Sequence, residues 1–185
     1  CMHCIVAAPT AGACGVLPAV LLPYGRRHEL TDDALIKALY VASGFGAVIA
    51  QRASISGAEA GCQAEIGTAA AMAAAALVYL HGGSSVQMAN AAAMALKNMM
   101  GLVCDPVAGL VEVPCIKRNA AGAMNALCAA EMALAGIESR IPPDEVIDAM
   151  AAVGAALPSS LRETGMGGIA ASPTAVKFRE EFFGQ

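Results

Sequence analysis

Large side chains and charges are scarce in this sequence. Tryptophan is absent, aromatic residues make up 4% of the 185 residues, and charged residues make up only 14%. The net charge is −4 and the few basic residues are scattered, so the sequence lacks the basic stripe that a nucleic-acid surface needs. Because 57% of the residues are hydrophobic, the chain also falls outside the disordered class.

Much of the hydrophobic content is alanine, and methionine supplies part of the rest. Alanine is the best helix former, and small side chains let helices approach each other closely. No useful length of chain alternates polar and apolar residues, so no strand is predicted. The composition predicts an all-α fold, a compact alanine-rich bundle that forms a single helical domain over residues 1–185.

Start and stop signals divide the chain into helices. Thr31 is a good N-cap, and Asp32 and Asp33 favour the first turn behind it. The predicted helices are a short one behind Pro18, then 31–52, 59–80, 86–100, 120–135 and 142–157, and a short charged helix after Pro173. Residues 101–119 have no helical period and contain two prolines, which predicts an ordered loop.

The distribution of apolar and charged residues along the sequence predicts neither a membrane-spanning segment nor an export signal. The most apolar stretch, Ile66 to Leu80, is about three-quarters of the length that a bilayer crossing needs, and it is mostly alanine. We therefore expect a buried central helix, no membrane partner and a cytoplasmic location. The chain opens on Cys1-Met2-His3-Cys4 without a start methionine, so we interpret it as a segment of a longer protein.

The seven cysteines lie in different settings, and without an export signal reduced thiols are expected rather than disulfides. Cys128 lies mid-helix among apolar residues and behaves as a small hydrophobe. Cys14 lies in a glycine loop, where a functional role and tight packing are equally good explanations. Cys1 and Cys4 are assigned nothing.

Cys62, Cys104 and Cys115 stand at breaks in the pattern, beside glycine or proline. At such breaks backbone N–H groups are free, and these groups donate to the sulfurs of metal clusters. No two of the three form a C-x-x-C pair, so the usual zinc-ribbon and ferredoxin spacings are absent. By spacing alone, packing thiols remain the better explanation.

The runs around these cysteines carry more information. APTAGACG (8–15), SGAEAGCQAE (56–65), GLVCDPVAGLVEVPCIKRN (101–119) and LRETGMGGIAASPT (161–174) resemble iron–sulfur-dependent L-serine dehydratase, specifically its alpha chain or alpha domain. The resemblance covers nearly the whole chain. It departs from the family at Ala11, where some members have Asn, and in lacking the family's N-terminal helical region and its beta domain.

The resemblance implies a cofactor and a reaction. Cys62, Cys104 and Cys115 would bind a 4Fe–4S cluster with one open iron, and the chain would convert L-serine to pyruvate and ammonia, a step of amino-acid degradation that feeds gluconeogenesis. The open iron would act as a Lewis acid on the departing hydroxyl. The resemblance also implies a helical alpha domain, a beta chain or beta domain as partner, and an oligomer.

Candidate site residues follow from closeness to these cysteines. A base must reach the α-proton of the substrate, and Glu59 or Asp105 is predicted for that role. The donors that could hold the substrate are Thr10, Ser56, Gly57, Arg118 and Asn119; a guanidinium fork in particular suits a carboxylate. His28 and His81 are expected to be surface residues without a role, and His3 is left open. The run 162–164 is equally well explained as a structural turn.

Two other classes of function remain open at this point. One is a non-catalytic iron–sulfur or zinc-binding interaction subunit. The other is a thiol enzyme with Cys14 or Cys62 as nucleophile, although no neighbouring base is evident in the sequence. Iron and sulfide content separates these possibilities.

Overall fold

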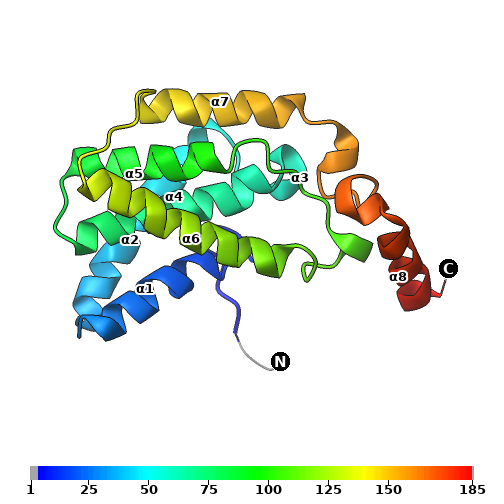
Figure 1. Cartoon of the computed structure of the whole chain (residues 1–185), viewed down its shortest axis with the longest axis horizontal. Coiled ribbons are helices and arrows are strands. Elements are labelled where there is room, and N and C mark those ends of the chain that lie inside the picture. Colours follow the sequence, from blue (N-terminus) through cyan, green and yellow to red (C-terminus); the bar gives the residue numbers. More distant parts are fainter. Residues whose placement is uncertain (1–3, 185) are drawn as a thin grey trace.

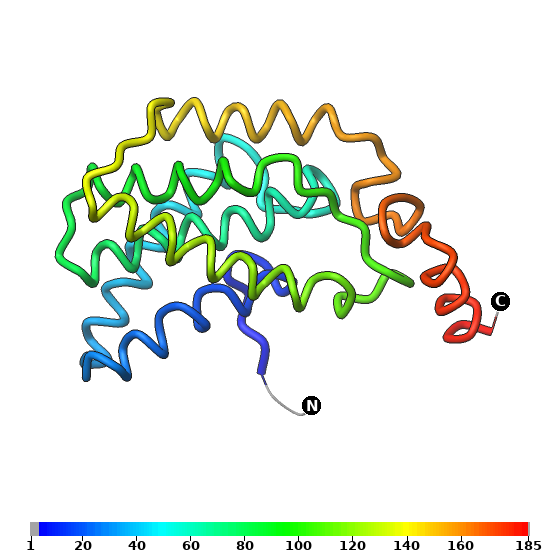
Figure 2. Tube along the Cα trace, viewed as in Figure 1, coloured from blue at the N-terminus to red at the C-terminus, as the bar shows by residue number. Residues whose placement is uncertain are grey.

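The computed structural model describes residues 4–184, so Cys1 and His3 lie outside the described part. Within it the chain forms eight α-helices and three short 3-10 turns, and no strand, which confirms the predicted all-α class (Figures 1 and 2). The helices are α1 (Val16–Arg27), α2 (Asp32–Arg52), α3 (Gly57–Ala60), α4 (Cys62–Leu80), α5 (Ser85–Asn98), α6 (Cys115–Leu134), α7 (Pro143–Ala156) and α8 (Pro173–Phe183). The 3-10 turns are η1 (Val107–Gly109), η2 (Ser159–Leu161) and η3 (Gly168–Ala171).

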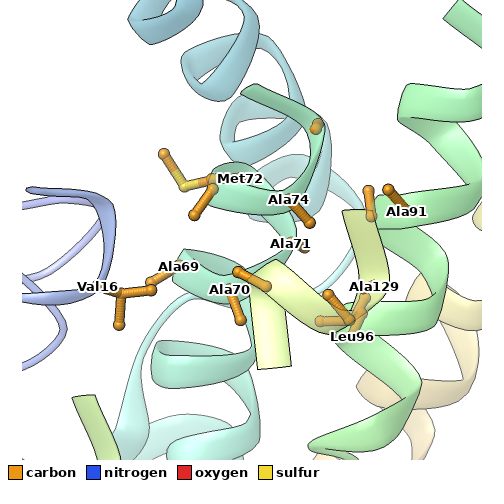
Figure 3. Packing of buried hydrophobic residues seen from close by; sticks show 14 of the residues in the cluster. Val16, Ala69, Ala70, Ala71, Met72, Ala74, Ala91, Leu96 and Ala129 are labelled. Carbon is orange, nitrogen blue, oxygen red and sulfur yellow. The ribbon is translucent and has the colours of Figure 1, made fainter. Parts of the chain in front are cut away.

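Helix α4 is the centre of the bundle. It packs against α1, α2, α5, α6 and α7, and nearly every side chain from Cys62 to Val78 is buried. Figure 3 shows Ala69 of α4 beside Val16 of α1. Because most of these side chains end at Cβ, the surrounding helices can approach α4 closely on every side.

Replacement of Ala71 by leucine should show how tightly this core is packed. Ala71 is 0% exposed, so the added atoms must displace neighbouring side chains or backbone, at a cost of about 1–3 kcal/mol of unfolding free energy. Ala50→Leu is the matched control, because Ala50 lies exposed on α2. Urea unfolding of both variants measures the difference, and equal stability of the two would contradict the close packing.

Two helices, α2 and α4, are long and apolar enough to cross a membrane by length and composition alone. In α4 the most apolar window is 83% buried inside the bundle, as expected for a core helix. In α2 the corresponding window is only 22% buried. The apolar outer face of α2 was not anticipated from the sequence, where only the stretch within α4 drew attention.

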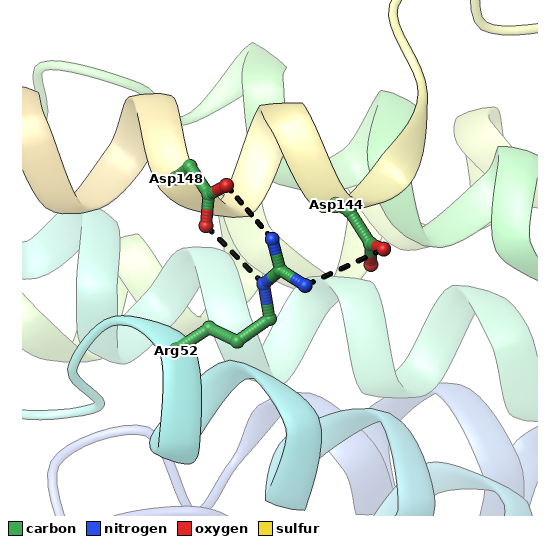
Figure 4. Close-up of polar contacts among 3 residues, drawn as sticks. All are labelled: Arg52, Asp144 and Asp148. Atoms are coloured by element: carbon green, nitrogen blue, oxygen red, sulfur yellow. Dashed lines mark hydrogen bonds and ion pairs between the residues drawn. The ribbon is translucent and has the colours of Figure 1, made fainter.

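Helix ends follow the capping signals. The hydroxyl of Thr31 accepts a hydrogen bond from the Ala34 N–H, so α2 begins where the sequence predicts. Ser84 and Gln87 form a capping box at the start of α5. At the other end of α2, Arg52 contacts Asp144 and Asp148 of α7 (Figure 4), with 2.7 Å between its Nη2 and Asp148 Oδ2.

Two predicted boundaries are wrong, and both lie beside a cysteine. The predicted helix over 59–80 is broken by Gly61, whose φ of 77° ends α3 and starts α4 at Cys62. The predicted loop over 101–119 is also too long, because α6 begins at Cys115 directly after Pro114. Each correction places a cysteine on the first residue of a helix.

Candidate metal centre

Three buried thiols meet where two helices begin. Cys62 opens α4 and Cys115 opens α6, while Cys104 lies in the segment that joins α5 to α6. Their exposed fractions are 1%, 5% and 3%, respectively. The Cys104 and Cys115 thiols both lie close enough to Cys62 to shift the pKa of its thiol. The tightest group, whose ligand atoms all lie within 4.8 Å of one another, is Cys62, Glu65 and Cys104, and Cys115 adjoins it through Cys62.

The backbone of Cys104 is held by the C-terminal part of the chain. Its N–H donates to the Leu161 carbonyl at 2.9 Å, and its carbonyl accepts from the Glu163 N–H at 2.8 Å. These two bonds pair Cys104 with Arg162 like neighbouring residues of parallel strands. Residues 161–163 therefore support Cys104 through their backbone, while the Arg162 side chain donates to the carbonyls of Ala155 and Leu157.

Glycine lets the chain approach the thiols closely. At Gly61 a Cβ atom would lie 2.7 Å from the Leu102 carbonyl oxygen, and the left-handed φ disfavours any other residue there as well. At Gly57 a Cβ atom would lie 3.0 Å from Cys104 Sγ. The glycines of the run 56–65 are thus required by the geometry that places Cys62 against Cys104.

Neighbouring thiols and burial keep Cys62 and Cys115 protonated without a metal. The Cys104 thiol, together with burial, raises the pKa of Cys62 to about 12. The Cys62 thiol, followed by burial, raises the pKa of Cys115. Metal binding must therefore displace these protons, which a cation that prefers thiolates does.

The donor set fits an iron–sulfur cluster. Three thiols converge from separate elements, and two of them start helices, where unpaired N–H groups and the helix dipole favour the negative charge of a metal thiolate centre. Cysteine thiolates are the usual protein ligands of such clusters. Cys62, Cys104 and Cys115 would hold the cluster and leave one iron without a cysteine.

Glu65 is the carboxylate that the structure adds to this group. One of its oxygens lies within 4.8 Å of the sulfurs of Cys62 and Cys104. The Thr10 hydroxyl donates a hydrogen bond to its Oε1, and a Cβ atom at Gly12 would lie only 2.6 Å from that oxygen. Burial raises the pKa of Glu65, while the bond from Thr10 opposes that shift.

The two carboxylates predicted as the base lie in other surroundings. Glu59 is exposed, and its carboxylate accepts a hydrogen bond of 2.5 Å from the Ser54 hydroxyl. Asp105 is buried: Oδ1 lies 2.8 Å from Arg118 Nη2 in an ion pair but makes no hydrogen bond, and Oδ2 accepts from the Ile169 N–H at 2.8 Å. Asp105 therefore links the cysteine loop to α6 and to η3.

Arg118 reaches the thiols directly. Its Nη1 donates to the Val103 carbonyl at 2.9 Å and lies 3.5 Å from Cys62 Sγ, while Nη2 pairs with Asp105. The positive charge lies next to the sulfur that would become a thiolate when metal binds. This position favours the charged form of Cys62.

The remaining predicted donors differ in how much they are engaged. Asn119 donates to the carbonyls of Gly12 and Cys115 and accepts from the Gly15 N–H, which fastens the loop at 8–15 to α6. Ser56 lies half-buried directly before Gly57, and its hydroxyl makes no hydrogen bond to cap α3. Thr10 and Gly57 are the two predicted substrate donors that border Glu65.

Comparison with known proteins agrees with this geometry. The family described as serine dehydratase alpha chain matches residues 1–170. The chain belongs to this family. The match spans all four runs that carry the sequence resemblance except the last residues of the fourth, and it includes the three clustered cysteines.

Curated members of the serine dehydratase alpha chain family are similar over almost the whole chain. The "Probable L-serine dehydratase, alpha chain" of Bacillus subtilis (strain 168) is 57% identical over 183 residues, 99% of this chain and 61% of the relative. The protein of the same name from Latilactobacillus sakei is 55% identical over 184 residues, 100% of this chain and 88% of the relative. "L-serine dehydratase 2" of Escherichia coli (strain K12) is 48% identical over 168 residues, 90% of this chain and 37% of the relative.

The chain is thus shorter than these family members, and it spans less than two thirds of the Bacillus subtilis relative. The remaining cysteines and histidines of the described part have other surroundings. Cys128 is exposed on α6, and Cys14 lines an apolar pocket between the loop at 4–8 and α1. His28 and His81 end α1 and α4 beside Tyr24, at the end of the bundle remote from the thiols.

Proposed function

We propose that this chain carries the chemistry of an L-serine dehydratase, converting L-serine to pyruvate and ammonia on a 4Fe–4S cluster held by Cys62, Cys104 and Cys115. The convergence of three buried thiols inside a serine dehydratase alpha chain is the observation that carries the proposal. When bound, the cluster supplies an iron that acts as a Lewis acid toward the β-hydroxyl of serine, a contribution of several kcal/mol.

The residues of the chain perform the other parts of the reaction. Glu65 is the candidate base, because its half-buried carboxylate borders the thiols, whereas Glu59 is exposed and Asp105 is ion-paired with Arg118. It accepts the α-proton of serine, and transfer of that proton to the departing hydroxide gives water and restores the carboxylate. The resulting aminoacrylate tautomerises to an imine, and hydrolysis releases pyruvate and ammonia.

Substrate binding is assigned to the donors around Glu65. The Thr10 hydroxyl donates to the Glu65 carboxylate, Gly57 lies against its other oxygen, and Ser56 directly precedes Gly57. Arg118 supplies positive charge near the substrate carboxylate, although its direct partners are Asp105 and Val103. Asn119 acts mainly by holding the 8–15 loop against α6.

Assembly and location are proposed on the same basis. We propose one helical domain over residues 1–185, an oligomer, a beta chain or beta domain as partner, and a cytoplasmic enzyme that binds neither nucleic acid nor membrane. The relatives' designation as an alpha chain supports a second type of chain. Exposed aromatic rings of α8, at Phe178, Phe182 and Phe183, offer apolar surface for such a partner.

A non-catalytic zinc-binding subunit is the second candidate. The grouping of Cys62, Glu65 and Cys104 favours it, since two thiolates and a carboxylate are ligands that zinc also accepts. Bound metal identity therefore decides between the two candidates.

Anaerobic reconstitution with iron and sulfide tests the proposed function. We expect brown protein with four irons per chain that forms pyruvate from L-serine, and we expect both colour and activity to disappear after treatment with an iron chelator. A matched sample reconstituted with zinc should form no pyruvate. Pyruvate formation that survives complete removal of iron would contradict the Lewis-acid mechanism.

A further inference from the structure

Glu65 occupies a position that base chemistry alone does not require. Cys62 and Glu65 are three residues apart on α4, so both side chains project from the same face of its first turn. A carboxylate oxygen of Glu65 approaches the sulfurs of two proposed ligands within 4.8 Å. The Glu65 carboxylate therefore borders the proposed metal site.

The surroundings of Glu65 hold the carboxylate in this position. Gly12 faces Oε1 and Gly57 faces Oε2, where Cβ atoms would lie 2.6 Å and 3.2 Å away. The bond from Thr10 fixes Oε1, which leaves Oε2 toward Gly57 and Cys104. Such restraint from surrounding groups is typical of residues that bind metals, whose ligands are oriented by hydrogen bonds.

We propose that Glu65 is the chain's own ligand to the iron that lacks a cysteine, that it binds this iron when substrate is absent, and that L-serine displaces it. The inference rests on the proposed function. An oxygen ligand is harder than a thiolate and is exchanged more easily, so it suits a position that substrate must take. Once displaced, the same carboxylate stands beside the substrate and is free to accept the α-proton.

This arrangement makes two different demands on Glu65. As a base it affects only turnover, whereas as a ligand it also affects how firmly the substrate-free protein holds its fourth iron. Loss of an iron from a four-iron cluster leaves a three-iron cluster with its own electron paramagnetic resonance spectrum. The two roles can therefore be measured separately on the same protein.

The experiment compares the reconstituted 185-residue chain with Glu65→Gln and with Glu131→Gln, an exposed carboxylate near the far end of α6. Each protein is exposed to a limited amount of air without substrate, and the three-iron signal is followed over time. We expect Glu65→Gln to lose its fourth iron about tenfold faster than wild type or more, by comparison with the losses seen when groups that support metal sites are removed. Glu131→Gln should match wild type, and L-serine should alter the spectrum of the reduced wild-type cluster.

Each outcome has a defined meaning. Equal rates of iron loss for Glu65→Gln and wild type overturn the ligand role, even if pyruvate formation is lost. Failure of wild type to take up four irons overturns the proposed function instead. If Glu65→Gln does not fold, Thr10→Val replaces it, because that variant keeps the carboxylate and removes its hydrogen bond; a wild-type rate of iron loss in Thr10→Val then overturns the inference.

Discussion

Cys104→Ala should abolish pyruvate formation and leave the reconstituted protein without a stable four-iron cluster. Cys104 is one of three thiols proposed to bind the metal, and its replacement removes a ligand whose backbone is held on both sides by residues 161–163. Several kcal/mol of Lewis-acid stabilisation correspond to a rate loss of at least about a thousandfold. Iron and sulfide analysis and a pyruvate assay, both under anaerobic conditions, measure the two effects.

Cys128→Ala is the control for this prediction. Cys128 is also a free thiol, but it lies exposed on α6 away from the cluster of cysteines. It should keep full iron content and full activity, as should wild type treated identically. Full iron content in Cys104→Ala would show that the ligand assignment is wrong.

Arg118→Leu should destabilise the protein by about 3–5 kcal/mol even without metal, because it leaves a buried charge without its partner. The side chain of Asp105 is only 3% exposed and that of Arg118 is 16% exposed, so little water can replace the lost ion pair. The Ile169 N–H would remain as a neutral partner of Asp105. Urea unfolding of the metal-free chain provides the measurement.

Two further variants serve as controls for the Arg118→Leu measurement. Arg52→Leu breaks an ion pair between exposed side chains on α2 and α7, and should cost about 1 kcal/mol or less. The double variant Arg118→Leu/Asp105→Asn removes the uncompensated charge and should regain much of the loss, as a double-mutant cycle would record. Arg118→Leu and Arg52→Leu with equal effects would refute the structural importance of the buried pair.

Much of the fold could be predicted because its signals are local. The Thr31 cap, the stop after Leu80 and the proline start of α7 each depend on a few adjacent residues, and the structure follows them. The break at Gly61 could not be predicted with the same ease. A glycine inside an apolar helical pattern is usually tolerated, and only contact with Leu102 and Leu157 from distant parts of the chain requires its left-handed backbone.

The sequence identified the cysteines of the candidate site, but it did not identify the carboxylate that lies beside them. The cysteines stand at breaks that the sequence displays, and the structure brings them together. Glu59 and Glu65 both lie three residues from Cys62, so spacing alone could not separate them. The turn at Gly61 directs Glu59 to solvent and leaves Glu65 on the face of Cys62, which is tertiary information.

The three thiols differ in how firmly the rest of the chain supports them. Cys62 is the first residue of the most deeply buried helix, so its position can change only if the bundle itself opens. Cys104 lies in an irregular segment fastened by its backbone pairing with residues 161–163 and by the Asp105 contacts beside it. We therefore expect the sulfur of Cys104 to withdraw before that of Cys62 when the centre is dismantled, so that the centre decays in the order in which local structure melts.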